Sequence, residues 1–140
     1  VTTKSGYIYI LDRETGEPIF GVEERAVPAS DVPGEVTYPT QPFPVKPQAL
    51  ARTSYEPSDI VTAEDTSPAH AAACAELVAS VGEIYNEGAF SPWVYREEGA
   101  SPRATLLFPG LVGGPNWGGA AFDPNSGYVF VFSQGAGSFA

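Results

Sequence analysis

The chain has 140 residues, of which 43% are hydrophobic, and a formal net charge of −10 at pH 7. This apolar content excludes a disordered chain, and the excess of carboxylates over the 7 Lys and Arg argues strongly against nucleic-acid binding, because each phosphate contact needs a cation. One cysteine and one histidine exclude an internal disulfide and a Cys/His metal cluster, so we expect no metal site within these residues.

The ends of the sequence indicate a segment of a longer protein. The chain contains no methionine, opens on Val-Thr-Thr and stops directly after a strand-like run. It carries no targeting leader and no apolar stretch of about 18 residues that would predict a membrane span. With 15 Gly and 14 Pro, we expect many turns and short strands.

Residues 5–20, "SGYIYILDRETGEPIF", predict a β-hairpin. An aromatic and β-branched run from Tyr7 to Leu11 is followed by a polar turn over 12–16 and a short return strand at Pro18 to Phe20. The other end of the chain echoes this unit. "FDPNSG" repeats the order of "LDRETG", and "SGYVFV" matches "SGYIYI". Two copies of one supersecondary unit predict a repeat architecture.

The two copies lie much further apart than the roughly 40 to 50 residues of one propeller blade, so an insertion must separate them. Residues 21–103 supply it. The first part is rich in proline, and the stretch "TYPTQPFPVKP" is incompatible with a central strand or a helix. We expect this part to cross the top of the fold, with its scattered acidic side chains in solvent.

One helix is expected within the insertion, over residues 68–86. Ser67 is a suitable N-cap, Pro68 suits the first turn, and Gly88 follows the end. Apolar residues at three-and-four spacing predict one buried stripe, which we interpret as the face of a covering helix: Cys74, Leu77, Val78, Val81, Ile84 and Tyr85. On this stripe Cys74 is expected to be a small core residue, whereas His70 is expected to face solvent.

Residues 104–140 predict three consecutive antiparallel strands, "ATLLFPG", "WGGAAFDP" and "GYVFVFS". A glycine-rich loop between the first two holds the pair Asn116 and Trp117. The glycines on both sides remove side-chain bulk, so another backbone or a flat ligand could approach closely.

Six stretches in order make nearly the whole chain resemble the dehydrogenases that use pyrroloquinoline quinone (PQQ), in the branch with the membrane-bound glucose, quinate and polyol enzymes. They are "TKSGYIYILDRETGEPI", "EERAVPASDVPGE", "TQPFP", "NEGAFSP", "LFPG" and "GGPNWGGAAFDPNSG". The resemblance implies an all-β fold, a fragment of an eight-bladed β-propeller. About one and a half blades would be present: a hairpin at 1–20, the helix-bearing insertion at 21–103 and the next blade at 104–140.

The resemblance also implies a reaction. An Asp takes the proton of a sugar, polyol or other alcohol, hydride passes to the quinone beside a bound Ca²⁺, and electrons leave to ubiquinone or cytochrome c. The catalytic Asp and the Ca²⁺ ligands are expected upstream of Val1, so the segment alone should be inactive. The implied location is the periplasm, with an inner-membrane anchor in the full-length protein as one option.

Three residues match cofactor-binding positions of this family: Lys4, Asn116 and Trp117. Lys4 would donate to the quinone oxygens, Asn116 would hydrogen-bond a polar edge, and Trp117 would line the loop. The alternatives are a solvated lysine, a plain turn residue and a blade-core tryptophan. A rival function also stays open, because related propellers serve as non-enzymatic scaffolds of the outer-membrane assembly lipoprotein type.

Overall fold

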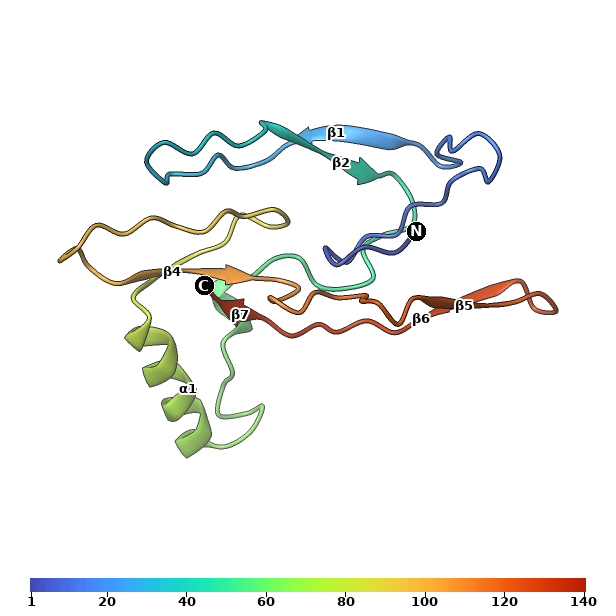
Figure 1. The fold of residues 1–140 in the computed structure, drawn as a ribbon. Coiled ribbons are helices and arrows are strands. Elements are labelled where there is room, and N and C mark those ends of the chain that lie inside the picture. The colour runs from blue at the N-terminus through green and yellow to red at the C-terminus, as the bar shows by residue number, and fades with distance from the viewer.

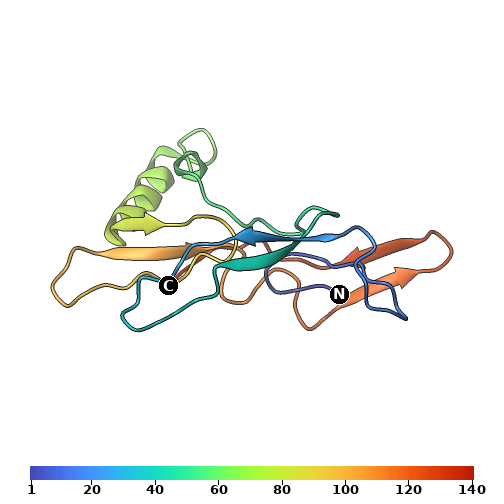
Figure 2. The same cartoon turned by 90° about the horizontal axis from the view of Figure 1, so that it is seen from above.

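The computed structural model describes all 140 residues. Seven strands, one 3₁₀ helix and one α-helix follow each other along the chain, so the fold is mostly β with a single helix, as expected. Their bounds are β1 (Val22–Ala26), β2 (Thr40–Pro44), η1 (Pro57–Asp59), α1 (Pro68–Ser80), β3 (Glu83–Tyr85), β4 (Arg103–Leu107), β5 (Ala120–Asp123), β6 (Tyr128–Val131) and β7 (Ser138–Phe139). Figure 1 shows β1 and β2 in an upper row and β4, β7, β6 and β5 in a lower row, with α1 projecting below. Seen from above, the strands overlap in one elongated band, and α1 lies to one side of it (Figure 2).

The hairpin expected at the N-terminus forms, although its ladder is short. Leu11 and Pro18 make one antiparallel bridge, beside a hydrogen bond of 2.9 Å from the Ile19 amide to the Ile10 carbonyl. Pro18 has no N–H to donate, which limits further pairing. A second pairing on the other side was not predicted: the Tyr9 amide bonds to the Val1 carbonyl at 2.8 Å.

The two echoed turns have the same local structure. Asp12 accepts hydrogen bonds from the backbone amides of Glu14 and Thr15, and Gly16 bonds back to the Asp12 carbonyl at 2.9 Å with φ of 77°. Asp123 repeats the pattern. It accepts from the Asn125 amide and the Ser126 hydroxyl, and Gly127 bonds back at 2.9 Å with φ of 73°. The repeat predicted from sequence is thus confirmed at the level of backbone and side-chain hydrogen bonds.

The proline-rich stretch contains a strand, but one with a single neighbour. β2 pairs antiparallel with β1 in a two-stranded sheet, in which Val22 is opposite Pro44 and Glu24 is opposite Pro42. A strand with an unpaired side tolerates proline because no ladder hydrogen bond is needed there. The prediction that this stretch avoids a central strand is confirmed.

The helix begins as predicted and ends earlier. The hydroxyl of Ser67 accepts a hydrogen bond from the His70 amide at 3.3 Å, and Pro68 is the first helical residue. The expected end at residue 86 is wrong. Gly82 takes φ of 80°, which stops the helix, and Glu83–Tyr85 form β3 instead.

No residue of α1 is buried, so the predicted buried stripe is also wrong in extent. Cys74, Leu77 and Val78 line a hollow of about 280 Å³ together with Phe108 and Phe139 near β4 and β7. Leu77 is nevertheless 63% exposed. Three of the six residues of the expected stripe thus face the hollow beside β4 and β7.

The prediction of three consecutive antiparallel strands at the C-terminal end is wrong. β5 and β6 form a hairpin by themselves, whereas β4 pairs in parallel with β3 and antiparallel with β7. The physical reason is the glycine-rich loop, which carries the chain away from β4 before β5 begins. Trp117 and Gly118 lie in this loop and not in a strand.

Only nine residues are buried, and Phe43 and Leu106 are the buried hydrophobic ones. The β5–β6 hairpin leaves its large apolar side chains in solvent, including Phe122, Tyr128 and Phe130. Four of the nine buried residues gather where the N-terminal turn meets the glycine-rich loop: Gly6, Gly113, Gly114 and Pro115. This junction therefore places buried backbone next to Lys4, Asn116 and Trp117 in the chain.

Candidate functional site

Lys4 lies in a tight turn directly before the first aromatic run. The Thr3 amide bonds to the Tyr7 carbonyl at 2.9 Å, and the Gly6 amide bonds back to Thr3 at 3.1 Å with φ of 88° at Gly6. The Thr3 hydroxyl also donates to the Tyr7 carbonyl at 2.9 Å. Because both ends of the turn are hydrogen-bonded, the Lys4 side chain projects from a fixed backbone into solvent.

The turn that carries Lys4 is packed against the glycine-rich loop. The Gly114 amide donates a hydrogen bond of 2.9 Å to the Lys4 carbonyl. A Cβ added at Gly113 would lie 2.8 Å from the Lys4 Cβ, and one added at Gly114 would lie 2.8 Å from the Ala51 Cβ. Glycine is therefore required here by close backbone approach. The structure thus brings the backbones of the Lys4 turn and of the glycine-rich loop into contact.

The amide of Asn116 closes the loop on itself. Its Nδ2 donates to the Val112 carbonyl at 3.0 Å, and its Oδ1 accepts from the Trp117 amide at 2.9 Å. Each amide atom keeps further hydrogen-bonding capacity, since an Asn side chain offers two donors and two lone pairs. Asn116 thus fixes the loop and can still address a neighbouring polar group.

Trp117 is 96% exposed. A side chain as large and apolar as an indole is normally covered by other protein atoms or by a ligand. Beside it, Gly118 and Gly119 leave open space, because a Cβ added at either would meet no atom within 4 Å. The indole and the two glycines together form an accessible, flat-sided surface.

A hollow of about 410 Å³ lies at this surface. Its walls include Asn116, Trp117, Gly118, Phe132 and Gln134. Gln134 was missed in the sequence analysis, because a lone amide after a strand carries no sequence signal. Its backbone amide donates to the Gly114 carbonyl at 3.3 Å, which ties it to the loop, while its side chain makes no hydrogen bond in the structure. Lys4 does not line this hollow; it contacts Gly113 of the loop that leads into it.

Few other polar groups gather near the loop. The Ser133 hydroxyl is buried without a hydrogen-bond partner and would lie 3.1 Å from a Cβ placed on Gly114. Nowhere in the chain do three or more His, Cys, Asp or Glu side chains meet in a metal-binding arrangement. No helix is long and apolar enough to cross a membrane. The chemistry available at the hollow is therefore that of amides, an indole and one nearby amine.

A comparison with protein-family models decides the kinship of this chain. All of its residues, 1–140, match the model of the PQQ glucose/ethanol/alcohol dehydrogenase β-propeller domain. The chain belongs to this family. The resemblance noted from the sequence is thereby confirmed, and the strands described above are part of a PQQ-dehydrogenase propeller domain.

Curated members of the PQQ dehydrogenase family match over most of the chain. The quinate/shikimate dehydrogenase (quinone) of Acinetobacter baylyi is 34% identical over 94% of the chain. The glycerol dehydrogenase large subunit of Gluconobacter thailandicus is 32% identical over 92%, and the quinoprotein glucose dehydrogenase of Escherichia coli is 33% identical over 87%. The chain covers 15%, 16% and 14% of these relatives, respectively. No solved structure gives a significant match.

The residues at the hollow fit the quinone that names the family. A planar ring system needs a flat apolar partner and side-chain bulk removed beside it, which the Trp117 indole and Gly118 and Gly119 offer. Polar ring substituents need hydrogen-bond groups, which Asn116 and Gln134 offer in the same hollow. A PQQ dehydrogenase segment with this loop can therefore contribute one wall of a cofactor site.

Proposed function

We propose that the full-length protein containing this chain is a PQQ-dependent dehydrogenase that oxidises a sugar, polyol or other alcohol. The observation that carries the proposal is the buried junction between the turn of Lys4 and the glycine-rich loop, in a chain that matches the family throughout. The names of the relatives, which specify quinate, glycerol and glucose, support this substrate class. They also favour a dehydrogenase over the scaffold alternative.

Within that enzyme, Lys4, Asn116 and Trp117 are proposed to contact the cofactor, with Gln134 as a further polar contact. When bound, PQQ supplies the two-electron acceptor for alcohol oxidation. The Lys4 ammonium stabilises negative charge on a quinone oxygen. Asn116 and Gln134 orient the ring edge through their amides, and Trp117 excludes water from one face. The general base and the ligands of a Ca²⁺ ion are proposed to come from the rest of the protein.

The finer architecture belongs to the same proposal. We infer an eight-bladed propeller, to which residues 1–20 and 104–140 contribute about one and a half blades, and over which residues 21–103 form the insertion. The twin turns at Asp12 and Asp123 support two blade-like units. Electron transfer to ubiquinone or cytochrome c and a periplasmic location, with or without a membrane anchor, complete the proposal.

The experiment replaces the two lysines of the chain one at a time in the full-length protein. Lys4→Ala is expected to weaken PQQ binding or to lower kcat by about tenfold or more, because a charge-assisted hydrogen bond contributes roughly 1.5–3 kcal/mol. Lys46→Ala is the matched control, since it removes the same charge from an exposed lysine that makes no backbone contact with the glycine-rich loop. Binding is followed by the absorbance of the bound quinone, and turnover with a dye acceptor. Identical affinity and kcat in wild type and Lys4→Ala would refute the assignment.

Trp117 provides a second readout that does not depend on turnover. Because the indole is 96% exposed, its fluorescence should shift and be quenched when PQQ stacks on it. The measurement uses a Trp93→Phe background, so that Trp117 is the remaining indole of this chain, and Trp117→Phe as the control that loses the signal. Emission that does not respond to saturating PQQ would place the cofactor elsewhere.

A further inference from the structure

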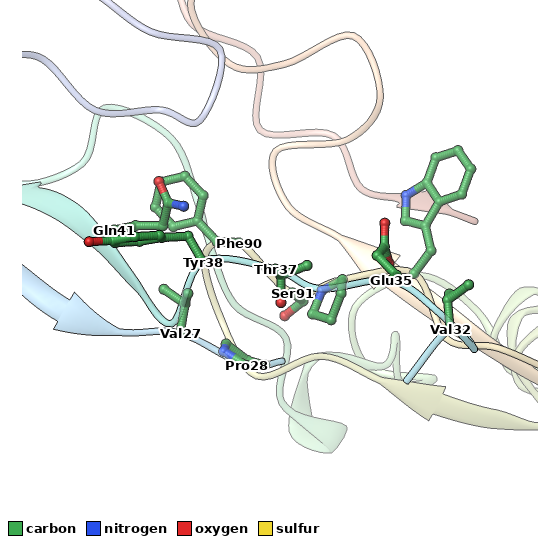
Figure 3. A pocket seen from close by; sticks show the side chains of 11 residues that line it. Val27, Pro28, Val32, Glu35, Thr37, Tyr38, Gln41, Phe90 and Ser91 are labelled. Atoms are coloured by element: carbon green, nitrogen blue, oxygen red, sulfur yellow. The ribbon is translucent and has the colours of Figure 1, made fainter. Parts of the chain in front are cut away.

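A larger hollow lies on another part of the chain, away from the glycine-rich loop. Its volume is about 510 Å³, within the range typical of small-molecule sites. It opens between the loop that joins β1 to β2 and the segment 90–93 that leads toward β4 (Figure 3). It shares no residue with the hollow at Trp117.

One end of this hollow is held by an aromatic cluster. Phe90 takes φ of 65°, a conformation that a bulky side chain rarely adopts. Its ring stacks on Tyr7 at 6.4 Å between centroids and meets Phe43 edge-on at 5.4 Å. Strained residues of this kind persist where the surroundings over-determine them, often at binding sites. The position of Phe90 is therefore fixed before any ligand arrives.

The two walls are tied to each other and to β4. The buried Thr105 hydroxyl donates to the Pro92 carbonyl and accepts from the Val94 amide, both at 2.9 Å. Asp31, from the β1–β2 loop, accepts from the Tyr95 amide at 2.7 Å and pairs with Arg103 at 2.9 Å. A hollow whose walls are cross-linked in this way is preorganised for a ligand.

The side chains that face the hollow combine aromatic surface with free polar groups. Figure 3 shows Gln41 and Tyr38 beside Phe90 at one end and Glu35 toward the other. Tyr38 and Trp93 are 72% and 60% exposed. The side chains of Gln41, Tyr38 and Trp93 make no hydrogen bond in the structure, and Glu35 uses one oxygen to accept from the Ser30 hydroxyl. Hydrogen-bond donors, hydrogen-bond acceptors and apolar ring faces thus surround one hollow.

The charge of the lining selects the type of ligand. Glu35 is the single residue of the lining that carries charge at neutral pH, and no Lys, Arg or His accompanies it. A carboxylate or phosphate ligand would meet a like charge without a compensating cation. A neutral molecule rich in hydroxyls meets an ionised acceptor in Glu35, an amide in Gln41 and apolar rings for its C–H faces.

We propose that this hollow binds a neutral polyhydroxylated molecule, a sugar or a polyol. The site is separate from the cofactor hollow, and its occupancy does not depend on the redox function proposed above. Trp93 and Tyr38 form the apolar surface for the ligand, and Gln41 and Glu35 read its hydroxyl groups. In a dehydrogenase of such molecules, the site would hold substrate or product away from the reacting centre.

The test measures binding to the full-length, PQQ-free protein by saturation-transfer difference NMR. The probes are glucose and gluconate, which both have six carbons and many hydroxyl groups; glucose is neutral, whereas gluconate carries a carboxylate. Wild type is expected to bind glucose at least about tenfold more tightly than gluconate, and Trp93→Ala combined with Gln41→Leu to lose about tenfold in glucose affinity. A variant with Trp93→Phe in place of Trp93→Ala keeps an aromatic ring and is expected to keep most of the glucose affinity.

Val36→Ala is the matched control, because Val36 belongs to the same loop, is 94% exposed and does not line the hollow. It is expected to bind glucose as wild type does. The proposal is overturned if the Trp93→Ala, Gln41→Leu variant binds glucose with unchanged affinity, or if gluconate binds as tightly as glucose. Either result leaves the PQQ-binding readouts of the Lys4 and Trp117 experiments unaffected, since those are measured without sugar.

Discussion

The backbone amide of Gly114 donates a 2.9 Å hydrogen bond to the carbonyl oxygen of Lys4. Through this single bond, a lysine at the start of the chain and an amide-indole pair near its end are held in one neighbourhood. Gly6, Gly113 and Pro115, which are buried, lie next to the two bonded residues in the chain or in space. Because the two residues are far apart in the sequence, the junction fixes the N-terminal turn against the glycine-rich loop.

Gly113→Ala is expected to destabilise this junction. Gly113 takes φ of 89°, and the added Cβ would lie 2.8 Å from the Lys4 Cβ. Backbone strain together with the clash should lower the free energy of unfolding by about 1–3 kcal/mol. Gly118→Ala is the control, because its Cβ would meet nothing within 4 Å. Urea unfolding of the full-length protein distinguishes the two, and equal midpoints for both variants would contradict the close approach.

Thr105→Val should be costly although it changes little volume. The Thr105 side chain is fully buried, and its hydroxyl serves both the Val94 amide and the Pro92 carbonyl. Valine leaves two backbone groups unsatisfied, for an expected loss of about 1–3 kcal/mol in the free energy of unfolding. Thr105→Ser keeps the hydroxyl and should lose less. Calorimetric unfolding measures both, and the reverse order would show that the hydroxyl is not what matters.

Asp31→Ala should release the β1–β2 loop from the segment after Trp93. The Asp31 carboxylate accepts hydrogen bonds from the Tyr95 amide and the Arg103 guanidinium, and both partners lower the pKa of Asp31 from its usual value. Without it, the Tyr95 amide loses its acceptor and should exchange its hydrogen faster. Asp65→Ala, which removes a carboxylate bonded only within its own turn, leaves Tyr95 unchanged. Hydrogen exchange followed by mass spectrometry checks both; equal rates at Tyr95 would disprove the tie.

The twin turns predict a specific loss of stability in acid. Hydrogen bonds from Thr15 and Glu14 lower the pKa of Asp12, and those from Ser126 and Asn125 lower the pKa of Asp123, both from an ordinary value of 3.8. A lowered pKa in the folded state stabilises the fold above pH 3.8, and this contribution is lost as the pH falls through and below that value. Asp12→Asn with Asp123→Asn should flatten the stability profile below about pH 4. Unfolding at pH 6 and pH 3 measures it, and an unchanged acid limb would contradict the shifts.

Features fixed by neighbouring residues could be predicted from the sequence. The Asp12 and Asp123 turns need only a carboxylate, a hydroxyl and a glycine within a few positions, so their pattern can be recognised in the sequence. The helix start at Ser67 and Pro68 is equally local. Its end differs from the prediction because Ile84 and Tyr85 fit the helical spacing as well as a strand, whereas Gly82, with φ of 80°, stops the helix before them.

Features that depend on partners far apart in the chain could not be predicted from the sequence. The parallel pairing of β3 with β4 and the return of β7 to Leu106 are set by tertiary contacts with no local signature. In the candidate site, the chemistry of Lys4, Asn116 and Trp117 was suggested by a family resemblance. Neither the inward bonds of the Asn116 amide nor the place of Gln134 in the same hollow could be read from spacing.

The agreement between the two Asp–Gly turns has a consequence for their exchange. Matching acid, hydroxyl and left-handed glycine at corresponding positions give both turns the same backbone course, and the two copies differ in what comes after the glycine. One copy continues into β6, and the other meets Pro18 after a single bridge. Interchanging the two hexapeptides should therefore be tolerated at the turns themselves, and any penalty should trace to the residue that follows them.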